Sequence, residues 1–213
     1  MKSEILKILR RADGFVSGQE LCDQLKVSRT AVWKRMKKLQ EEGYVIEAVQ
    51  NKGYRLAQAP DLIQADEVSS WLSTKWLGQE IHYKESVDST NTWAKVLAEE
   101  GAPHGTVVLA DEQTAGKGRR GRGWANPKGG NLAFTYLQRR LFLPESAPML
   151  TLVMGLSVAQ VCREYGLDAW IKWPNDVVVN KKKICGILTE MSAQIDYVNY
   201  VVIGTGINVN PVS

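Results

Sequence analysis

Histidine and cysteine are scarce in this sequence, which limits the chemistry it can support. Two histidines and three cysteines occur among 213 residues. Cys22, Cys162 and Cys185 are far apart in apolar surroundings, and no Cys-x-x-Cys pair is present. This pattern favours neither a zinc site nor a disulfide framework, so we predict no metal-binding residues. His82 and His104 fit no ligand or catalytic pattern, and we interpret both as structural.

Long apolar runs are also lacking. The N-terminus has no apolar leader, because the periodic apolar residues of a helix begin at once with Ile5 and Leu6. The most apolar stretch, residues 147–162, is interrupted by polar residues and is shorter than the roughly 20 residues that a membrane span needs. We therefore expect a buried core helix there, and a cytosolic (cytoplasmic) protein with no membrane partner.

Charge is unevenly distributed along the chain. Residues 1–60 hold twelve Lys/Arg and seven Asp/Glu, a net charge of +5. The remaining residues hold fifteen and sixteen, a net charge of −1. The positive field of the first sixty residues indicates a polyanionic partner for that part of the chain.

The first sixty residues show the pattern of a winged helix-turn-helix. Helical periodicity covers residues 3–11, and Ser17 and Ser28 are placed to cap two further helices, the last reaching residue 42. Two short strands, residues 44–49 and 53–57, follow around a turn. We therefore predict a DNA-binding domain over residues 1–60.

The third of these helices carries most of the basic residues. Six Lys/Arg and no acidic residue lie between Lys26 and Lys38. A solvated charged face is the ordinary explanation of such a run, but the fold context and a basic wing favour DNA. The predicted DNA-binding residues are Ser28, Arg29, Thr30, Trp33, Lys34, Arg35, Lys37, Lys52 and Arg55.

A polar break at residues 58–61 separates this domain from a second one, residues 61–213, in which helix and strand patterns alternate. Helices are predicted at 66–73, 91–100 and 149–165. Strands are predicted at 80–85, 106–112, 131–138, 169–172, 176–179, 184–191 and 197–205. The chain is thus predicted to be α+β, with a mixed β-sheet and packed helices in the second domain.

A glycine-rich basic segment, residues 114–124, follows one of these strands. Four glycines and four Lys/Arg alternate there. Glycine lets backbone N–H groups approach an anion closely, and the cations balance the anion's charge. A flexible surface loop would explain the glycines, but not why so much positive charge lies in a domain that is otherwise negative.

Two known nucleotide-binding motifs do not fit this segment. Gly116, Gly118 and Gly121 satisfy the dinucleotide pattern G-x-G-x-x-G, but a second turn-rich stretch follows in place of a helix. An acidic residue for the ribose is also missing about 20 residues further on, where the sequence is apolar. A Walker A loop is excluded because no Gly-Lys-Ser/Thr occurs.

Further polar clusters are weak when taken singly. Ser89-Thr90-Asn91 is typical of a helix cap, and residues 172–176 (Lys-Trp-Pro-Asn-Asp) are typical of a turn. Lys183 fits an exposed hairpin equally well. Two glycines at 204 and 206 end a strand, which suggests that something approaches the backbone closely.

Taken in order, these segments resemble the biotin–protein ligase family over essentially the whole chain. The resemblance is to the form that carries an N-terminal winged helix and also acts as a biotin-operon repressor. The most specific match is residues 116–124, against the family's Gly-Arg-Gly-Arg-x-Gly-Arg-x-Trp signature, with Lys117 in place of an arginine. Lysine keeps the charge but lacks the planar fork for two-point hydrogen bonding. The resemblance implies the class II aminoacyl-tRNA synthetase-like fold of a biotin ligase catalytic domain.

The resemblance also implies residue roles. The biotin rings and ureido group would contact Ser89, Thr90, Asn91 and Gln113. The biotin carboxylate and the phosphate would be met by Lys117, Gly118, Arg119 and Lys183. The adenine would lie near Trp124, Asn175 and Asn208. The catalytic residues would be Lys183, Arg119 and Asp176.

The implied reaction has two steps. Biotin and ATP, with Mg²⁺, give biotinyl-adenylate and pyrophosphate, and a lysine of a biotin carboxyl carrier protein then displaces AMP. The adenylate-bound protein would form a homodimer that represses biotin genes by binding operator DNA. Two alternatives stay open: a ligand-sensing repressor without turnover, and a ligase for another acid such as lipoate. Family members of this type continue beyond the point that corresponds to Ser213, so we expect a catalytic domain that is incomplete at its C-terminal end.

Overall fold

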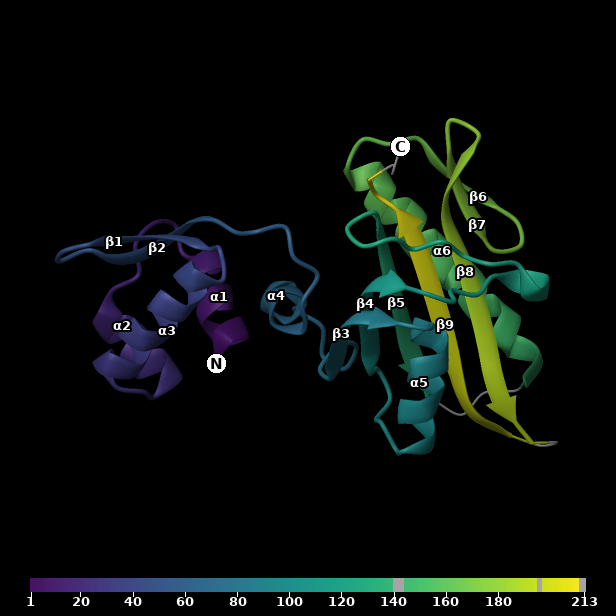
Figure 1. Cartoon of the computed structure of the whole chain (residues 1–213), viewed down its shortest axis with the longest axis horizontal. Helices are drawn as coiled ribbons and strands as arrows, with labels where there is room; N and C mark the ends of the chain where they lie inside the picture. The colour runs from purple at the N-terminus through teal and green to yellow at the C-terminus, as the bar shows by residue number, and fades with distance from the viewer. Residues whose placement is uncertain (140–143, 195–196, 211–213) are drawn as a thin grey trace. The chain divides into compact units, whose positions relative to one another are not determined.

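The structure is a computed structural model that describes residues 1–139, 144–194 and 197–210. The end of the chain, where an incomplete catalytic domain is expected, lies outside the described residues. The chain forms two compact units, Met1–Ser73 and Thr74–Ser213 (Figure 1). This division lies later than the predicted boundary at residue 60, because one more helix packs on the first unit.

Three helices and a hairpin form the first unit, as the sequence predicts. They are α1 (Lys2–Arg11), α2 (Gly18–Leu25), α3 (Arg29–Glu41), β1 (Val45–Val49) and β2 (Gly53–Gln58). Both predicted caps form, since the Ser17 and Ser28 hydroxyls accept hydrogen bonds from backbone N–H groups three residues on. The side chains with no exposed surface between the helices are Ile5, Leu6, Leu21 and Leu39. This arrangement is a winged helix-turn-helix.

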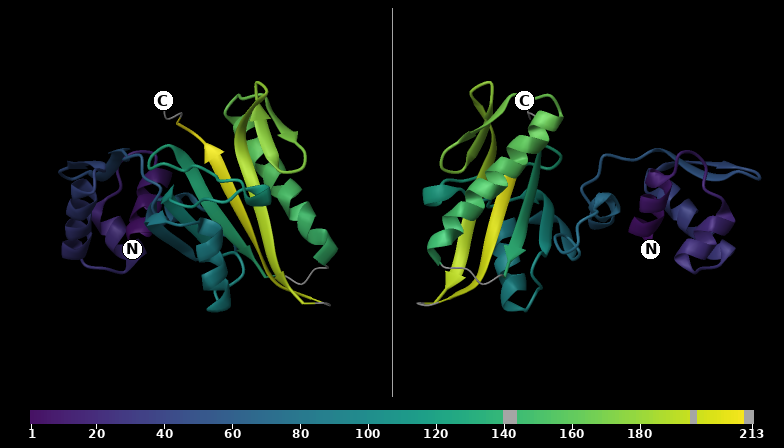
Figure 2. Two further views of the ribbon diagram at one scale, coloured as in Figure 1. Left: turned by 45° about the vertical axis from the view of Figure 1, so that its right-hand side comes forward. Right: turned by 180° about the vertical axis from the view of Figure 1, so that it is seen from behind.

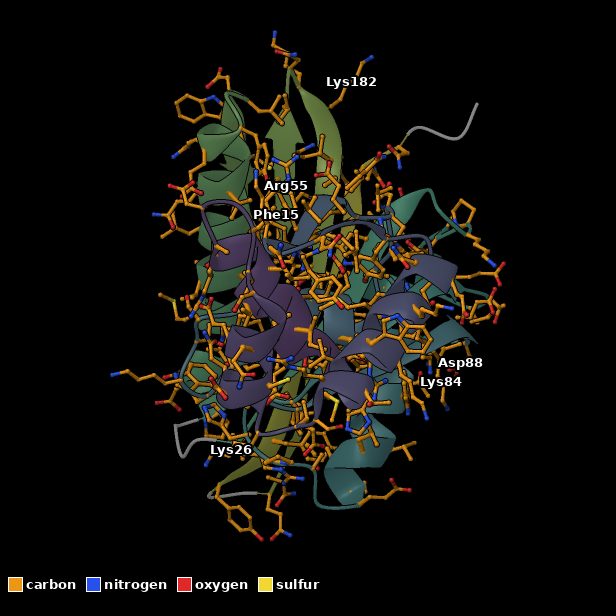
Figure 3. All side chains as sticks on the ribbon, turned by 90° about the vertical axis from the view of Figure 1, so that its left-hand side faces the viewer. Phe15, Lys26, Arg55, Lys84, Asp88 and Lys182 are labelled. Atoms are coloured by element: carbon orange, nitrogen blue, oxygen red, sulfur yellow. The ribbon has the colours of Figure 1, made fainter. Side chains whose placement is uncertain are left out.

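The hairpin is fastened to the connection between α1 and α2. Val16 and Tyr54 exchange two backbone hydrogen bonds of 2.8 Å. Gly53 lies at φ +110° directly against the Val16 carbonyl, where a Cβ atom would overlap the backbone. Arg55 lies 5.1 Å from the centre of the Phe15 ring, and Figure 3 shows these two side chains together. The wing is therefore held in place relative to the helices of this unit.

A fourth helix, α4 (Ala65–Trp71), also belongs to the first unit. Its Glu67 is buried and accepts hydrogen bonds from Tyr44 Oη (2.6 Å) and from Arg10 of α1. The Arg10 guanidinium also lies 4.4 Å from the centre of the Trp71 ring. Because of these contacts, the first unit ends at Ser73 and not at the predicted boundary, residue 60.

A seven-stranded mixed sheet forms the second unit, which confirms the predicted α+β class. The strands are β3 (Ile81–Val87), β4 (Val107–Gln113), β5 (Asn131–Gln138), β6 (Ala169–Lys172), β7 (Asp176–Val179), β8 (Lys182–Ala193) and β9 (Val198–Asn208). Their order is β3-β4-β5-β9-β8-β7-β6. β3 and β4 are parallel, and the other neighbours are antiparallel. Two long helices accompany the sheet, α5 (Thr90–Glu99) and α6 (Ala147–Glu164).

The two long helices cover opposite faces of the sheet. α5 packs through Ala94 on a buried cluster that includes Val202 of β9. α6 packs through Val158 on a second cluster that includes Val201 and Ile203 of the same strand. Because successive residues of a strand point to opposite faces, the two helices lie on opposite sides. Figure 2 shows α6 running lengthwise along its side of the sheet.

The expectation of a buried core helix at residues 147–162 is wrong for one face of α6. Val158 and Ala159 are buried on the inner face, but Met149 and Val153 are 59% and 58% exposed. The segment Pro144–Glu164, which includes the short 3₁₀ helix η2 (Pro144–Ser146), is long and apolar enough to cross a membrane by length and composition alone. Apolar composition alone does not show whether a helix is packed against the protein on one face or on all faces.

Candidate ligand-binding site and DNA-binding face

A small cavity opens between the start of α5, the loop after β4, and strands β8 and β9. Its volume is about 60 Å³. It gathers ten of the predicted ligand-binding residues: Ser89, Thr90, Asn91, Gln113, Lys117, Gly118, Arg119, Trp124, Asn175 and Lys183. An adjoining pocket of about 430 Å³ shares the loop residues with it and adds Asp176. Asn208 belongs to neither described lining; its Nδ2 donates to the Lys183 carbonyl at 3.3 Å.

The floor of the cavity is a network of polar side chains. Thr90 donates to Gln113 Oε1 twice, from its backbone N (2.8 Å) and from its hydroxyl (2.9 Å). Thr135 of β5 donates to Asn91 Oδ1 (2.7 Å). Thr90, Asn91 and Thr135 are buried. Because Gln113 Oε1 is occupied, its Nε2 is left as a donor at the cavity with no partner among the described residues.

Ser89 does not cap α5 with its side chain, contrary to the expectation for the Ser89-Thr90-Asn91 cluster. Ser89 is the N-cap by position, but its hydroxyl makes no capping hydrogen bond. Its backbone N donates instead to Asp88 Oδ1 at 2.6 Å. The hydroxyl therefore remains available at the cavity wall, which favours a ligand-binding role.

The two glycines near the end of β9 make room for side chains of the protein itself. A Cβ at Gly204 would overlap the Asn91 amide, and a Cβ at Gly206 would overlap the Trp124 ring. The two glycines predict that another group approaches the backbone of this strand closely, and the structure confirms it: the groups are the side chains of Asn91 and Trp124. Gly204 and Gly206 thereby bring the polar floor and the indole against the strand.

The glycine-rich loop is folded back on itself and joined to the far wall of the cavity. Trp124 N donates to Gly116 O at 2.8 Å, and Gly118 N donates to Arg122 O at 2.7 Å. Between them lies a short 3₁₀ helix, η1 (Arg119–Gly121). The Arg119 guanidinium donates to Asn175 Oδ1 at 3.1 Å. The loop thus lies over the cavity, with Lys117 and Arg119 in the cavity lining.

Asn175 is itself held by β8. Its Nδ2 donates to the Ile187 carbonyl at 3.0 Å, and Ile187 N donates to the Asn175 carbonyl at 2.9 Å. Residues 172–176, which look like an ordinary turn in the sequence, therefore place a fixed amide oxygen where the loop can reach it. This turn is part of the site.

Lys183 and Asp176 form an ion pair beside the cavity. Lys183 Nζ lies 2.8 Å from Asp176 Oδ1 and 5.4 Å from the centre of the Trp124 ring. The pair is close in distance, yet Asp176 Oδ1 is buried and receives no aligned hydrogen bond. Asp176 therefore attracts the Lys183 ammonium by charge, and its Oδ1 can still accept a hydrogen bond.

In the part of the chain that the structure describes, histidine and cysteine form no metal cluster. Within residues 1–139, 144–194 and 197–210, no three His, Cys, Asp or Glu side chains come close enough to hold a metal ion. His104 stacks on Trp76 with ring centres 4.4 Å apart, and His82 Nε2 lies 2.7 Å from Glu80. Burial raises the pKa of the Cys185 thiol to about 12, which makes it a poor nucleophile.

The predicted DNA-binding residues of α3 form one exposed face, with one exception. Arg29, Trp33 and Lys37 follow one another along the helix and are exposed. Lys37 Nζ lies 4.4 Å from the centre of the Trp33 ring. Thr30 and Lys34 are exposed beside them, and Ser28 caps the helix.

Arg35 is the exception. It is half-buried and its guanidinium contacts the Met1 sulfur at 3.8 Å, which places it on another side of α3 from Trp33. On the wing, Lys52 is exposed, whereas Arg55 is paired with Glu47 at 2.8 Å. A groove of about 480 Å³ lies between the start of α2, Arg29 and the wing with Lys52.

Comparison with known protein families identifies both units. Residues 83–208 match the biotin/lipoate A/B protein ligase family, and residues 2–55 match an HTH domain. The first match covers more than half of the chain and all of the cavity. The chain belongs to the biotin/lipoate A/B protein ligase family.

Individual relatives agree with this assignment. The chain is 42% identical over 212 residues to the bifunctional ligase/repressor BirA of Bacillus subtilis, covering 99% of this chain and 65% of the relative. It is 35% identical over 195 residues to the protein of the same name from Escherichia coli, covering 91% of this chain and 59% of the relative. The chain therefore spans less than two thirds of the length of these relatives.

Solved structures of biotin protein ligases match part of the chain. A biotin protein ligase from Aquifex aeolicus in complex with biotin and ATP superposes with a TM-score of 0.51 and 34% identity, over 63% of this chain and 54% of that one. The ligase from Leishmania major in complex with biotinyl-5-AMP gives 0.52 and 33%, over 63% and 59%. The fold predicted from the motifs is confirmed.

Proposed function

We propose that this chain activates biotin with ATP to form biotinyl-5'-adenylate and transfers biotin to a lysine of a biotin carboxyl carrier protein. We propose also that its N-terminal unit binds operator DNA and represses biotin genes. The support is the match to relatives named bifunctional ligase/repressor across both units, together with the geometry of the cavity and of α3. A cytoplasmic location belongs to the same proposal.

The polar floor is the observation that carries the choice of biotin. A cyclic urea offers two N–H donors and one carbonyl acceptor, which suit the Ser89 hydroxyl and the Gln113 Nε2 donor. The dithiolane ring of lipoate offers no comparable group. It would cover the Ser89 hydroxyl and Gln113 Nε2 without giving them hydrogen-bond partners, at about 1–3 kcal/mol for each group. The floor therefore favours biotin over the alternative acid.

The cations of the loop and of β8 suit the first chemical step. A carboxylate oxygen of biotin attacks the α-phosphorus of ATP, and pyrophosphate leaves with the electrons of the broken P–O bond. Lys117, Arg119 and Lys183 face this region and stabilise the negative charge on the phosphate oxygens. Asp176 orients Lys183 through their ion pair. In the second step a lysine amine attacks the biotinyl carbonyl, and AMP leaves.

The adenine would lie in the larger pocket, near Trp124 and Asn175, with Asn208 behind Lys183. Mg²⁺ is proposed to enter with ATP, because it commonly takes phosphate oxygens, water and one or two carboxylates as ligands. Asp176 is the one carboxylate among the described residues of this pocket. When bound, the ion supplies positive charge to the phosphates.

The repressor half of the proposal rests on the exposed face of α3. Arg29, Trp33 and Lys37 can enter a major groove while Lys52 of the wing meets the backbone. We propose that the adenylate-bound chain forms a homodimer, because two half-sites that are read together raise the affinity of a small domain.

Release of pyrophosphate tests the enzymatic proposal. Purified chain with biotin and ATP is expected to release pyrophosphate, and the same chain with lipoate and ATP is not. Biotin that raises the thermal unfolding midpoint without any pyrophosphate would support a ligand-sensing repressor instead. Turnover with lipoate alone would support a different acid as substrate.

A further inference from the structure

Glu190 lies on β8 behind the floor of the cavity and outside the predicted site residues. We propose that Glu190 is a positioning residue, which fixes Asn91 in the floor of the cavity. The inference rests on the proposed function where it concerns biotin, because Asn91 is one of the groups assigned to that ligand.

The contact with Asn91 is direct. Glu190 Oε2 accepts a hydrogen bond from Asn91 Nδ2 at 2.8 Å. The same Nδ2 donates to the Leu188 carbonyl at 3.1 Å, and Asn91 Oδ1 accepts from Thr135. Both hydrogens and the oxygen of the Asn91 amide are therefore engaged within the protein. Asn91 presses against Gly204, so its position determines the shape of the cavity floor.

The charge of Glu190 is retained and balanced. Burial raises the pKa of this carboxyl, but hydrogen bonds from Lys95 and Asn91 and the charges of Lys95 and Lys117 outweigh it, and the pKa is lowered. Lys95 Nζ lies 2.5 Å from Glu190 Oε1. An ionised carboxylate therefore stands behind a cavity that is proposed to take an anionic acid, with Lys95 to neutralise it.

Three variants separate the hydrogen bond from the charge. Glu190→Ala removes both, whereas Glu190→Gln can still accept from Asn91 but loses the charge that pairs with Lys95. Lys95→Met is the matched control, because it removes the other partner of Glu190 and leaves the contact with Asn91 in place.

Biotin titration calorimetry and the kinetics of pyrophosphate release test the role in the cavity. Glu190→Ala is expected to raise the Kd and KM for biotin about tenfold, as the loss of one charge-assisted hydrogen bond does. The KM for ATP is expected to change by less than about twofold. Glu190→Gln is expected to restore most of the biotin affinity. Lys95→Met leaves the Glu190 charge unbalanced but keeps the contact with Asn91, so it is expected to lose much less affinity than Glu190→Ala. Unchanged biotin affinity in Glu190→Ala, or parallel losses for biotin and ATP, would overturn the inference.

The thermal unfolding midpoint without any ligand tests the contact with Asn91 independently of biotin. Glu190→Ala is expected to unfold at a lower temperature than the wild type, because the Asn91 amide loses a hydrogen-bond partner, and Glu190→Gln is expected to unfold near the wild type. Equal midpoints for Glu190→Ala and Glu190→Gln would overturn the inference. A wild-type chain that binds no biotin would contradict the proposed function, and the unfolding midpoints would still decide whether Glu190 holds Asn91.

Discussion

Arg119 reaches across the cavity to Asn175, with 3.1 Å between its guanidinium nitrogen and the amide oxygen. The two residues belong to the glycine-rich loop and to the turn between β6 and β7, which are separate motifs in the sequence. Asn175 is fixed in turn by Ile187 of β8. One arginine therefore joins the loop to the sheet, and its remaining N–H groups at the cavity can donate to the proposed anionic ligand.

Replacement of Arg119 tests this relationship. Arg119→Gly removes charge-assisted hydrogen bonds that contribute about 1.5–3 kcal/mol each. Pre-formed biotinyl-adenylate is therefore expected to leave the variant roughly ten- to a hundredfold faster. Rapid dilution with detection of the free adenylate measures the rate.

Arg119→Lys serves as the graded control, since it keeps the charge and loses the fork. Its release rate is expected to lie between those of the wild type and Arg119→Gly. The escaping adenylate is a reactive acyl donor, so lysines of bystander proteins are expected to be labelled by the glycine variant. A wild-type release rate in Arg119→Gly would refute the role assigned to this residue.

The exposed face of α3 predicts a difference between neighbouring cations. Lys34 and Lys37 are exposed, whereas Arg35 is half-buried beside Met1. Lys34→Ala with Lys37→Ala is expected to weaken DNA binding and to reduce the slope of log K against log salt by about 0.9 for each lost phosphate contact. Arg35→Ala is the control, with a slope like that of the wild type. Fluorescence anisotropy at several salt concentrations measures all three, and equal slopes for the double variant and the wild type would contradict this placement.

Gly53 and Gly14 form a matched pair in the first unit. Both have positive φ, but only Gly53 lies against backbone atoms, and nothing surrounds the Cβ position of Gly14 within 4 Å. Gly14→Ala is expected to cost about 1 kcal/mol in the free energy of unfolding. Gly53→Ala is expected to cost about 1–3 kcal/mol more, because the wing must shift.

The Gly53→Ala variant is also expected to bind DNA more weakly, while its pyrophosphate release stays at the wild-type rate. Chemical denaturation and DNA titration of the full chain measure the two effects. Similar stability losses in Gly53→Ala and Gly14→Ala would show that the wing does not depend on the contact with Val16.

The sequence predicts local features well and long-range contacts poorly. Ser17 and Ser28 were predicted as caps because a cap depends on residues three positions away, and both form. The strand Asn131–Gln138 is predicted with its observed bounds, because a strand pattern is likewise read from neighbouring residues. By contrast, Arg10 meets Glu67 only in the folded unit, so the place of α4 could not be derived from a polar break at residues 58–61.

The candidate site divides in the same way. Residues 116–124 and 172–176 carry compact motifs, and the structure brings them to one cavity. Thr135 and Glu190 lie in unremarkable strand sequence and act on Asn91 only through the sheet. The outward face of α6 was missed because apolar composition does not specify on how many sides a helix is covered.

Coupling between ligand and DNA is expected if the repressor proposal holds. An anion that orders the basic loop removes conformational entropy before dimerisation. A nearby surface then loses less entropy when it binds a second chain. A non-hydrolysable adenylate analogue is therefore expected to raise both the dimer population and the operator affinity, by a coupling free energy of about 1–3 kcal/mol. Sedimentation and DNA titration, each with and without the analogue, measure the effect. Tight binding of the analogue with no change in either constant would contradict the repressor proposal.

The most direct test of the central claim is the mass of the ligand that the chain retains after incubation with biotin and ATP. Native mass spectrometry of the purified chain is expected to show biotinyl-5'-adenylate bound to the wild type. Much less is expected on Arg119→Gly, and no lipoyl-adenylate after incubation with lipoate and ATP. Biotin alone on the protein, with ATP present and no adenylate formed, would contradict the account.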